Sequence, residues 1–289
     1  MGNPVPRTKN IMSQPTYQSV VLAQRPKDHI IPGETFAKKT NPMVSEKDLK
    51  DGEILVETLY LSLDPAMRGW LNDRRSYVPP VQIGETMRGI AIGRVLASKA
   101  TAKYPVGSYV TAYAGWTELA IIDSSNPNLN LVHVPSNGKI TDALGVVGPT
   151  GLTAYFGMLE VGQVKAGDFV VVSGAAGATG SVACQIAKLK GATVLGIAGS
   201  DEKVKWLKEL GCDDALNYKD ANFAANFKAS TKDLIDVFFD NVGGDVLELA
   251  LSRAKAHSRF VMCGAISQYN SSQPQGPKNF SMVIAMRIK

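Results

Sequence analysis

The stretch Gly174-Ala-Ala-Gly177-Ala-Thr-Gly180 lies between an apolar run at residues 169–172 and a helix-like segment at 181–190. A strand, a glycine turn and a helix in this order form a phosphate cradle. Glycine lets the backbone approach an anion, and the helix N-terminus presents free N–H groups. The spacing is Gly-x-x-Gly-x-x-Gly instead of the better-known Gly-x-Gly-x-x-Gly. On its own, this spacing is also compatible with a tight structural turn that binds nothing.

Strands and helices alternate through residues 146–289, which we predict to form one α/β domain. The predicted strands are at 169–173, 193–198, 215–218, 235–240 and 259–264, and the predicted helices are at 152–159, 181–190, 201–210, 223–230 and 246–254. Such alternation is typical of a parallel sheet with right-handed crossovers. Because a glycine turn follows the first strand, the pattern favours a Rossmann domain, which is a doubly wound sheet that binds a dinucleotide.

Residues 15–145 have a different, β-rich pattern. Short alternating or β-branched runs recur at 18–22, 53–61, 89–96, 109–114 and 118–122, and Gly, Pro, Asn and Asp separate them. This rhythm predicts a small barrel or sandwich. Residues 1–14 are predicted to be a disordered extension.

Composition excludes several classes of protein. The 289 residues are 45% apolar and 20% charged, as expected of a globular protein with a sizeable core. No apolar run reaches the roughly 18 residues of a transmembrane helix, so we expect no membrane span. The few, scattered cysteines fit a reducing compartment, so we expect a cytoplasmic location. The net charge of +5 is mild and its basic residues come in pairs, which argues against nucleic-acid binding. Three cysteines and three histidines are scattered, so neither a disulfide framework nor a metal site is expected.

The end of the second predicted strand indicates which dinucleotide is bound. NAD-binding domains place an acidic residue there to hold the ribose 2′-hydroxyl, but this strand ends in Gly199-Ser200. Ser200 has the character of a helix N-cap, so the acids after it need no ligand. Lys203 is unexpected in a first helical turn, because the helix dipole disfavours a cation there. A 2′-phosphate would offset that cost, which favours NADP; the alternative is a solvated surface lysine.

A series of motifs spans the chain from about residue 17: Leu61-Ser-Leu-Asp-Pro-Ala-Met-Arg-Gly69, Met87-Arg-Gly89, residues 148–157, residues 174–181, Gly199-Ser-Asp-Glu-Lys203, Asn217-Tyr-Lys219, Asp240-Asn-Val-Gly-Gly244 and Cys263-Gly-Ala-Ile-Ser-Gln-Tyr-Asn270. Together they resemble the zinc-free branch of the medium-chain dehydrogenase/reductase superfamily. Within it, the chain is most similar to the NADP-dependent alkenal/one reductases, the prostaglandin reductase (leukotriene B4 dehydrogenase) group and curcumin reductase. The resemblance implies a GroES-like β-barrel followed by the Rossmann domain.

The resemblance also implies site residues. The pyrophosphate would lie on Gly177, Ala178, Thr179 and Gly180, and the adenosine 2′-phosphate end on Ser200, Lys203 and Tyr218. Asn241 would lie near the nicotinamide, and the nicotinamide and substrate would be lined by Cys263, Gly264, Ala265, Ile266, Ser267 and Tyr269. Three alternatives stay open: Tyr218 as an ordinary strand aromatic, Asn241 as a turn residue, and Tyr269 as a core residue whose hydroxyl is satisfied.

The implied activity is NADPH-dependent reduction of the C=C bond of an α,β-unsaturated aldehyde or ketone. Hydride would pass to the β-carbon without a metal, and Tyr269 would stabilise the charge that develops on the carbonyl oxygen. Rival readings are quinone reduction and an inactive NADPH-binding protein.

The chain departs from its look-alikes at two points. Ala66 stands where many of them have a tyrosine that lines the substrate pocket, which bears on substrate identity. The sequence also stops at Lys289, where they continue into a sixth sheet strand. That strand commonly pairs across a homodimer. We therefore expect an incomplete Rossmann sheet. Without the sixth strand the homodimer is doubtful, and the unpaired edge is expected to lower solubility.

Overall fold

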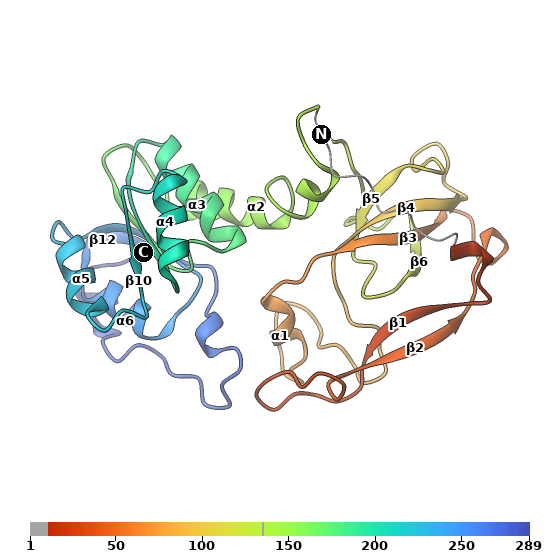
Figure 1. Cartoon of the computed structure of the whole chain (residues 1–289), viewed down its shortest axis with the longest axis horizontal. Helices are drawn as coiled ribbons and strands as arrows, with labels where there is room; N and C mark the ends of the chain where they lie inside the picture. Colours follow the sequence, from red (N-terminus) through yellow and green to blue (C-terminus); the bar gives the residue numbers. More distant parts are fainter. Residues whose placement is uncertain (1–10, 135) are drawn as a thin grey trace. The chain divides into compact units, whose positions relative to one another are not determined.

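The computed structural model describes residues 11–134 and 136–289, and the chain divides into two units, Met1–Leu144 and Gly145–Lys289 (Figure 1). The predicted disordered extension falls mostly on residues 1–10, which lie outside the described residues. Its last part contains the short 3₁₀ helix η1, Ile11–Ser13.

Antiparallel strands form the N-terminal unit. Its larger sheet has the order β6-β3-β4-β5-β7, made of Leu119–Asp123, Glu53–Leu61, Ala91–Ser98, Tyr109–Ala112 and Asn130–Leu131. A second sheet pairs β1, Thr16–Leu22, with β2, Phe36–Pro42. Isolated bridges from Ser19 and Val21 connect β1 to segments near the larger sheet. This confirms the β-rich pattern that the sequence predicts.

Helices are short in this unit. Among the described residues they are α1, Ala66–Trp70, and, besides η1, the 3₁₀ helices η2, Glu46–Asp48, and η3, Ile140–Leu144. The sequence pattern misses β2, because its residues Phe-Ala-Lys-Lys-Thr-Asn-Pro are mostly polar and exposed and show no alternation. Only the pairing with β1 makes this segment a strand.

Parallel strands form the C-terminal unit, in the order β10-β9-β8-β11-β12. They are Asp214–Asn217, Thr193–Ala198, Phe169–Val172, Ile235–Asp240 and Ala254–Met262, and each pairs in parallel with its neighbours. The helix α2 (Pro149–Phe156) and the π-helix η4 (Gly157–Val161) precede these strands. The helices between the strands are α3 (Ala178–Leu189), α4 (Asp201–Glu209), α5 (Phe223–Ser230) and α6 (Gly244–Leu251), and the 3₁₀ helix η5 (Ile266–Gln268) and α7 (Ser281–Ala285) follow the last strand. In sequence order the sheet is 3-2-1-4-5, so the predicted α/β doubly wound fold is confirmed.

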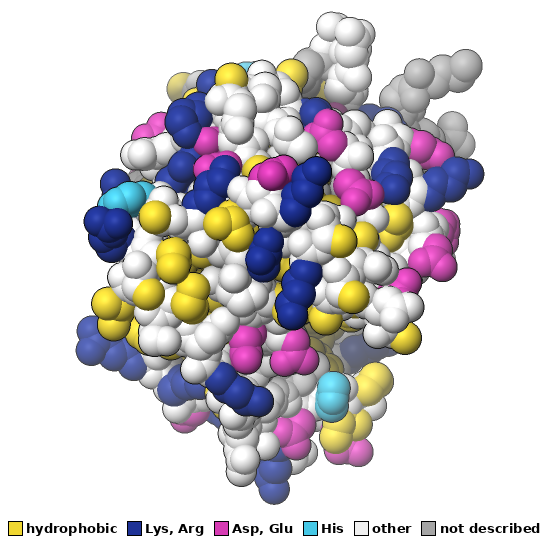
Figure 2. Space-filling model, turned by 90° about the vertical axis from the view of Figure 1, so that its left-hand side faces the viewer, with side chains coloured by type: hydrophobic (Ala, Val, Ile, Leu, Met, Phe, Trp, Pro, Cys, Tyr) yellow, Lys and Arg dark blue, Asp and Glu magenta, His cyan; other side chains and the backbone are white. Residues whose placement is uncertain are grey.

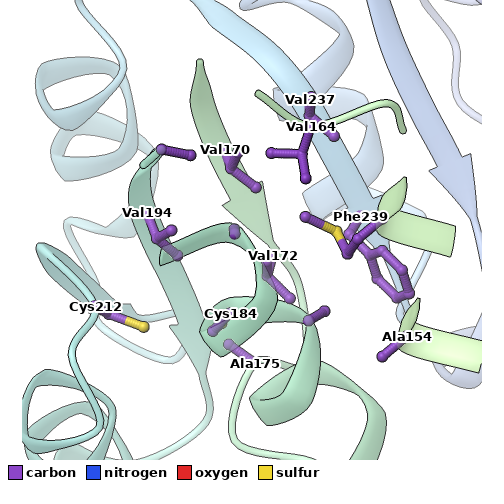
Figure 3. Packing of buried hydrophobic residues seen from close by; sticks show 14 of the residues in the cluster. Ala154, Val164, Val170, Val172, Ala175, Cys184, Val194, Cys212, Val237 and Phe239 are labelled. Carbon is purple, nitrogen blue, oxygen red and sulfur yellow. The ribbon is translucent and has the colours of Figure 1, made fainter. Parts of the chain in front are cut away.

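Alternate residues of each central strand face the two layers of helices. Val170 and Val172 of β8 point into a core with α2, α3 and α4, while Val171 points into the core with α5 and α6. Figure 3 shows the first of these cores, in which Phe239 of β11 points toward the helix that carries Ala154. Complete burial on both faces explains why these strands are near-continuous apolar runs.

The last strand differs from its prediction. β12 begins at Ala254, five residues before the predicted start at 259, and α6 ends at Leu251 before the predicted 254. A register shift separates the pairs Ile235–Ala254 and Val237–Arg259, and His257 within it has a φ of 63°. This irregular segment has no strand periodicity, so the sequence pattern places the strand too late.

The outer edge of β12 is hydrogen bonded in part. Lys289 donates its N–H to the Ser258 carbonyl at 3.0 Å, and its own carbonyl accepts the Phe260 N–H at 2.9 Å. These two bonds have the pattern of a parallel pair. The His257 N–H also donates to the Met286 carbonyl, at 2.7 Å. The segment after α7 therefore covers part of the edge that the sequence analysis expects to be unpaired.

The surface shows mixed charge. On the face shown in Figure 2, Lys and Arg side chains lie among Asp and Glu side chains instead of forming a field of one sign. Among the described residues, no helix is long and apolar enough to cross a membrane.

Candidate cofactor site

The predicted site residues of the C-terminal unit come to one edge of its parallel sheet. Each lies just after a strand or at the start of the helix that follows, at the carboxyl ends of β8 to β12. In open α/β sheets ligands bind at this edge, in the crevice where the strand order reverses. Here the order reverses between β8 and β11.

The glycine turn after β8 presents an anion site. Gly177 is the N-cap of α3, and its helix begins at Ala178. The N–H groups of Ala178, Thr179 and Gly180 have no acceptor within residues 11–134 and 136–289. A Cβ on Gly180 would lie 2.3 Å from the Gly174 carbonyl oxygen, so only glycine lets the helix approach the turn this closely. Free N–H groups at the start of a 12-residue helix suit a phosphate.

The ends of β9 and β10 carry the residues predicted for the 2′-phosphate. Ser200 is the N-cap of α4, and its Oγ accepts the Lys203 N–H at 3.3 Å. The Tyr218 ring lies against Gly199, where a Cβ would come within 2.8 Å of it. Both Lys203 and Tyr218 are exposed.

Two further contacts at this end bear on cofactor choice. Asp201 accepts a hydrogen bond from the Asn217 side chain at 2.8 Å, so its carboxylate has a structural partner. Lys219, which the sequence analysis does not single out, holds its Nζ 5.9 Å from the centre of the Tyr218 ring. Two exposed lysines, Lys203 and Lys219, therefore lie at this end, while the Asp201 carboxylate is already hydrogen bonded.

The end of β11 is tied to the end of β8. Asn241 donates its backbone N–H to the Ser173 Oγ at 2.9 Å and its side-chain amide N–H to the Ser173 carbonyl at 2.7 Å. The Ser173 hydroxyl in turn donates to the Asp240 carboxyl at 2.6 Å. Asn241 is half-buried, and its side-chain amide is held against the end of β8 by the hydrogen bond to Ser173.

The loop after β12 packs against the loop after β11. Ser267 donates its hydroxyl to the Val242 carbonyl at 2.7 Å, and the Ile266 N–H donates to the Asn241 carbonyl at 3.2 Å. Burial, and then the nearby Asp240 carboxylate, raises the pKa of the Cys263 thiol. A thiol with a raised pKa stays protonated and weakly nucleophilic.

The Tyr269 hydroxyl lies inside this loop. It accepts the Ala265 N–H at 3.1 Å, and a Cβ on Gly264 would lie 3.0 Å from its oxygen. Its own proton has no acceptor in the part of the chain that the structure describes. The hydroxyl is thus positioned by one hydrogen bond and retains a proton that it can donate.

Within residues 11–134 and 136–289, no three His, Cys, Asp or Glu side chains gather where they could hold a metal ion.

Two family models match the chain in order. Residues 18–129 match the N-terminal domain of oxidoreductase, and residues 178–288 match a model described as zinc-binding dehydrogenase. Prostaglandin reductase 1 of Bos taurus is 45% identical over 230 residues, which cover 79% of this chain and 68% of that protein. The NADPH-dependent curcumin reductase of Escherichia coli (strain K12) is 37% identical over 271 residues, which cover 93% and 76%. The crystal structure of CurA in complex with NADPH from Vibrio vulnificus has a TM-score of 0.85 at 40% identity, covering 94% of this chain and 80% of that one.

The chain belongs to the medium-chain dehydrogenase/reductase family.

The predicted cofactor residues of this chain lie in a row along the carboxyl edge of the sheet, in the order of its strands. The candidate 2′-phosphate residues follow β9 and β10, the glycine turn follows β8, and the candidate nicotinamide residues follow β11 and β12. The structure thus brings Ser200, Lys203 and Tyr218 together at one end. At the other end it brings together Asn241, Cys263, Gly264, Ala265, Ile266, Ser267 and Tyr269.

Two residues outside the predicted set also lie at this edge. Ser173 and Asp240 connect β8 to β11, and no sequence pattern assigned them a role. A polar residue at the end of each buried strand is the signal that could have found them. Ala66, the family position of interest in the N-terminal unit, is the first residue of α1 and is exposed.

Proposed function

We propose that this oxidoreductase reduces the C=C bond of an α,β-unsaturated aldehyde or ketone. The cofactor is NADPH, and the enzyme is NADP-dependent, in line with the NADPH-dependent curcumin reductase and the NADPH-bound CurA to which it is similar. The observation that carries the proposal is the Tyr269 hydroxyl, which lies on the candidate nicotinamide loop with a proton free to donate.

Residues along the edge would hold NADPH. The free N–H groups of Ala178, Thr179 and Gly180 would bind the pyrophosphate. Lys203 and Tyr218 would bind the 2′-phosphate, because a cation and a phenol donor are suited to a dianion, and the neighbouring Asp201 carboxylate already has Asn217 as its partner. Asn241 and residues 263–267 would line the nicotinamide.

When bound at this edge, NADPH would supply the hydride for the β-carbon of the substrate. The electron pair of the C=C bond then moves toward the carbonyl oxygen, where negative charge develops. Tyr269 donates a hydrogen bond to that oxygen, and the Ala265 N–H holds the phenol in place. The α-carbon takes a proton from Tyr269 or from water, so one hydride and one proton have added across the double bond.

This role for Tyr269 requires no protein-bound metal. A metal would stabilise the same charge on the carbonyl oxygen; in this proposal the Tyr269 phenol takes that role. The three cysteines are free thiols, which is consistent with the reducing cytoplasm as its compartment.

The direct experiment measures NADPH oxidation with a panel of enals, enones and quinones. We expect turnover on enals and enones, and we expect Tyr269→Phe to lower kcat by about 10²-fold, as expected for the loss of one oxyanion donor. Tyr17→Phe, in the N-terminal unit, is the control and should keep full activity. Turnover on quinones alone would favour quinone reduction. NADPH binding without turnover on any compound would favour an inactive binding protein.

A further inference from the structure

A buried carboxylate lies where the order of the strands reverses. Asp240 is the last residue of β11, and its exposed fraction is 0%. β11 is the neighbour of β8, so Asp240 and Ser173 lie side by side at the carboxyl edge of the sheet, where the strand order reverses. Among the described residues, no Lys, Arg or His forms an ion pair with Asp240.

Hydrogen-bond donors surround this carboxyl group. The Ser173 hydroxyl donates to its Oδ1 at 2.6 Å, and the Val242 and Gly243 N–H groups each donate to the same oxygen at 3.0 Å. The Gly243 N–H also lies 3.1 Å from Oδ2. Every partner is a donor, which suits the ionised form, because a carboxylate can only accept. Donors of this kind stabilise a buried carboxylate without cancelling its charge.

The charge of Asp240 acts on the loop after β12. The Cys263 and Gly264 N–H groups both donate to the Asp240 backbone carbonyl at 2.9 Å, so this loop lies directly against the residue. The raised pKa of the Cys263 thiol has the Asp240 carboxylate as its second cause, after burial. The field of the Asp240 carboxylate, which has no cation as its partner among the described residues, therefore acts on the loop on which we place the nicotinamide.

We propose that the Asp240 carboxylate stabilises the positive charge of the oxidised nicotinamide ring. The inference rests on the proposed function, in which the nicotinamide lies beside Asn241 and residues 263–267. The ring is neutral in NADPH and carries one positive charge in NADP⁺. A fixed carboxylate in a water-poor site stabilises that charge without reorganising. Because its side chain is wholly buried, Asp240 acts through its field and through the residues it positions.

A purely structural role makes a different prediction. If Asp240 only holds the turn at residues 241–244, its neutralisation disturbs the site for both forms of the cofactor, and both dissociation constants change by the same factor. If the charge matters, the dissociation constant of NADP⁺ rises by a larger factor than that of NADPH. The ratio of the dissociation constants of NADP⁺ and NADPH therefore separates the two explanations.

The experiment is calorimetric titration of the full chain with NADP⁺ and with NADPH. We expect Asp240→Asn to raise this ratio about five- to tenfold, the size expected for one partly screened charge pair. Asp236→Asn is the matched control, because Asp236 lies on the same strand toward its other end and bonds to Phe169 and Lys255. That variant should leave the ratio unchanged.

A second variant keeps the test decisive if Asp240→Asn does not fold. Asn241→Asp adds a carboxylate beside Asp240 and should lower the ratio by a similar factor. An unchanged ratio in whichever of the two variants folds would overturn the inference, while the proposed function would stand. A wild-type chain that binds neither form would overturn the proposed function, and the inference with it.

Discussion

At the scale of single residues, the choice between NADP and NAD depends on few side chains. Lys203 is exposed in the first turn of α4, where its N–H donates to the N-cap Ser200, and the Tyr218 ring lies against the neighbouring Gly199. The acid that follows Ser200 is already bonded to Asn217. The sequence predicted this preference from charge alone, because the missing acid and the misplaced lysine are both visible in the printed chain.

Replacing Lys203 tests that preference. We expect Lys203→Ala to raise the KM for NADPH about tenfold, because one charge-assisted contact to the 2′-phosphate is lost. The KM for NADH should change little, since NADH lacks that phosphate. Lys205→Ala is the control on the same helix, because Lys205 is exposed and forms only a long ion pair with Glu209, at 3.9 Å. Equal losses for NADPH and NADH would remove Lys203 from the 2′-phosphate site.

At the scale of elements, the sequence predicts the strands that are buried on both faces of the sheet. The strands β8, β9 and β11 are buried on both faces, so their apolar runs identify them. Prediction from sequence failed for β2, which is polar, and for the start of β12, where the register shifts. It also missed the bond between Ser173 and Asp240, because their contact joins positions 67 residues apart and leaves no local pattern.

The glycine turn and α3 are packed tightly against each other at Gly180. Replacing Gly180 tests whether cofactor binding depends on this close contact. A Cβ there would lie 2.3 Å from the Gly174 oxygen and 2.8 Å from the Ala175 Cα, so α3 would have to move away from the turn. We expect Gly180→Ala to weaken NADPH binding at least tenfold and to cost about 1–3 kcal/mol of unfolding free energy. Gly276→Ala, which meets nothing within 4 Å, is the control for titration and for denaturant unfolding. Unchanged affinity in Gly180→Ala would contradict the close approach of helix and turn.

At the scale of the whole molecule, the order of the strands brings motifs that are separate in the sequence to one edge of the sheet. The five strands place the candidate 2′-phosphate residues, the glycine turn and the candidate nicotinamide loop in sequence along a single edge. The sequence named these motifs, but only the order β10-β9-β8-β11-β12 shows that they follow one another in space. The central claim is that hydride from NADPH reaches the β-carbon of an enone.

Transfer of deuterium tests this claim most directly. The full chain is incubated with an enone and with NADPH that carries deuterium at C4 of the nicotinamide, one face at a time, and the product is analysed by NMR. The account predicts a saturated ketone with one deuterium on the β-carbon, from one of the two labelled faces only. Deuterium on the carbonyl carbon, as in an allylic alcohol, or no label in any product, would contradict it.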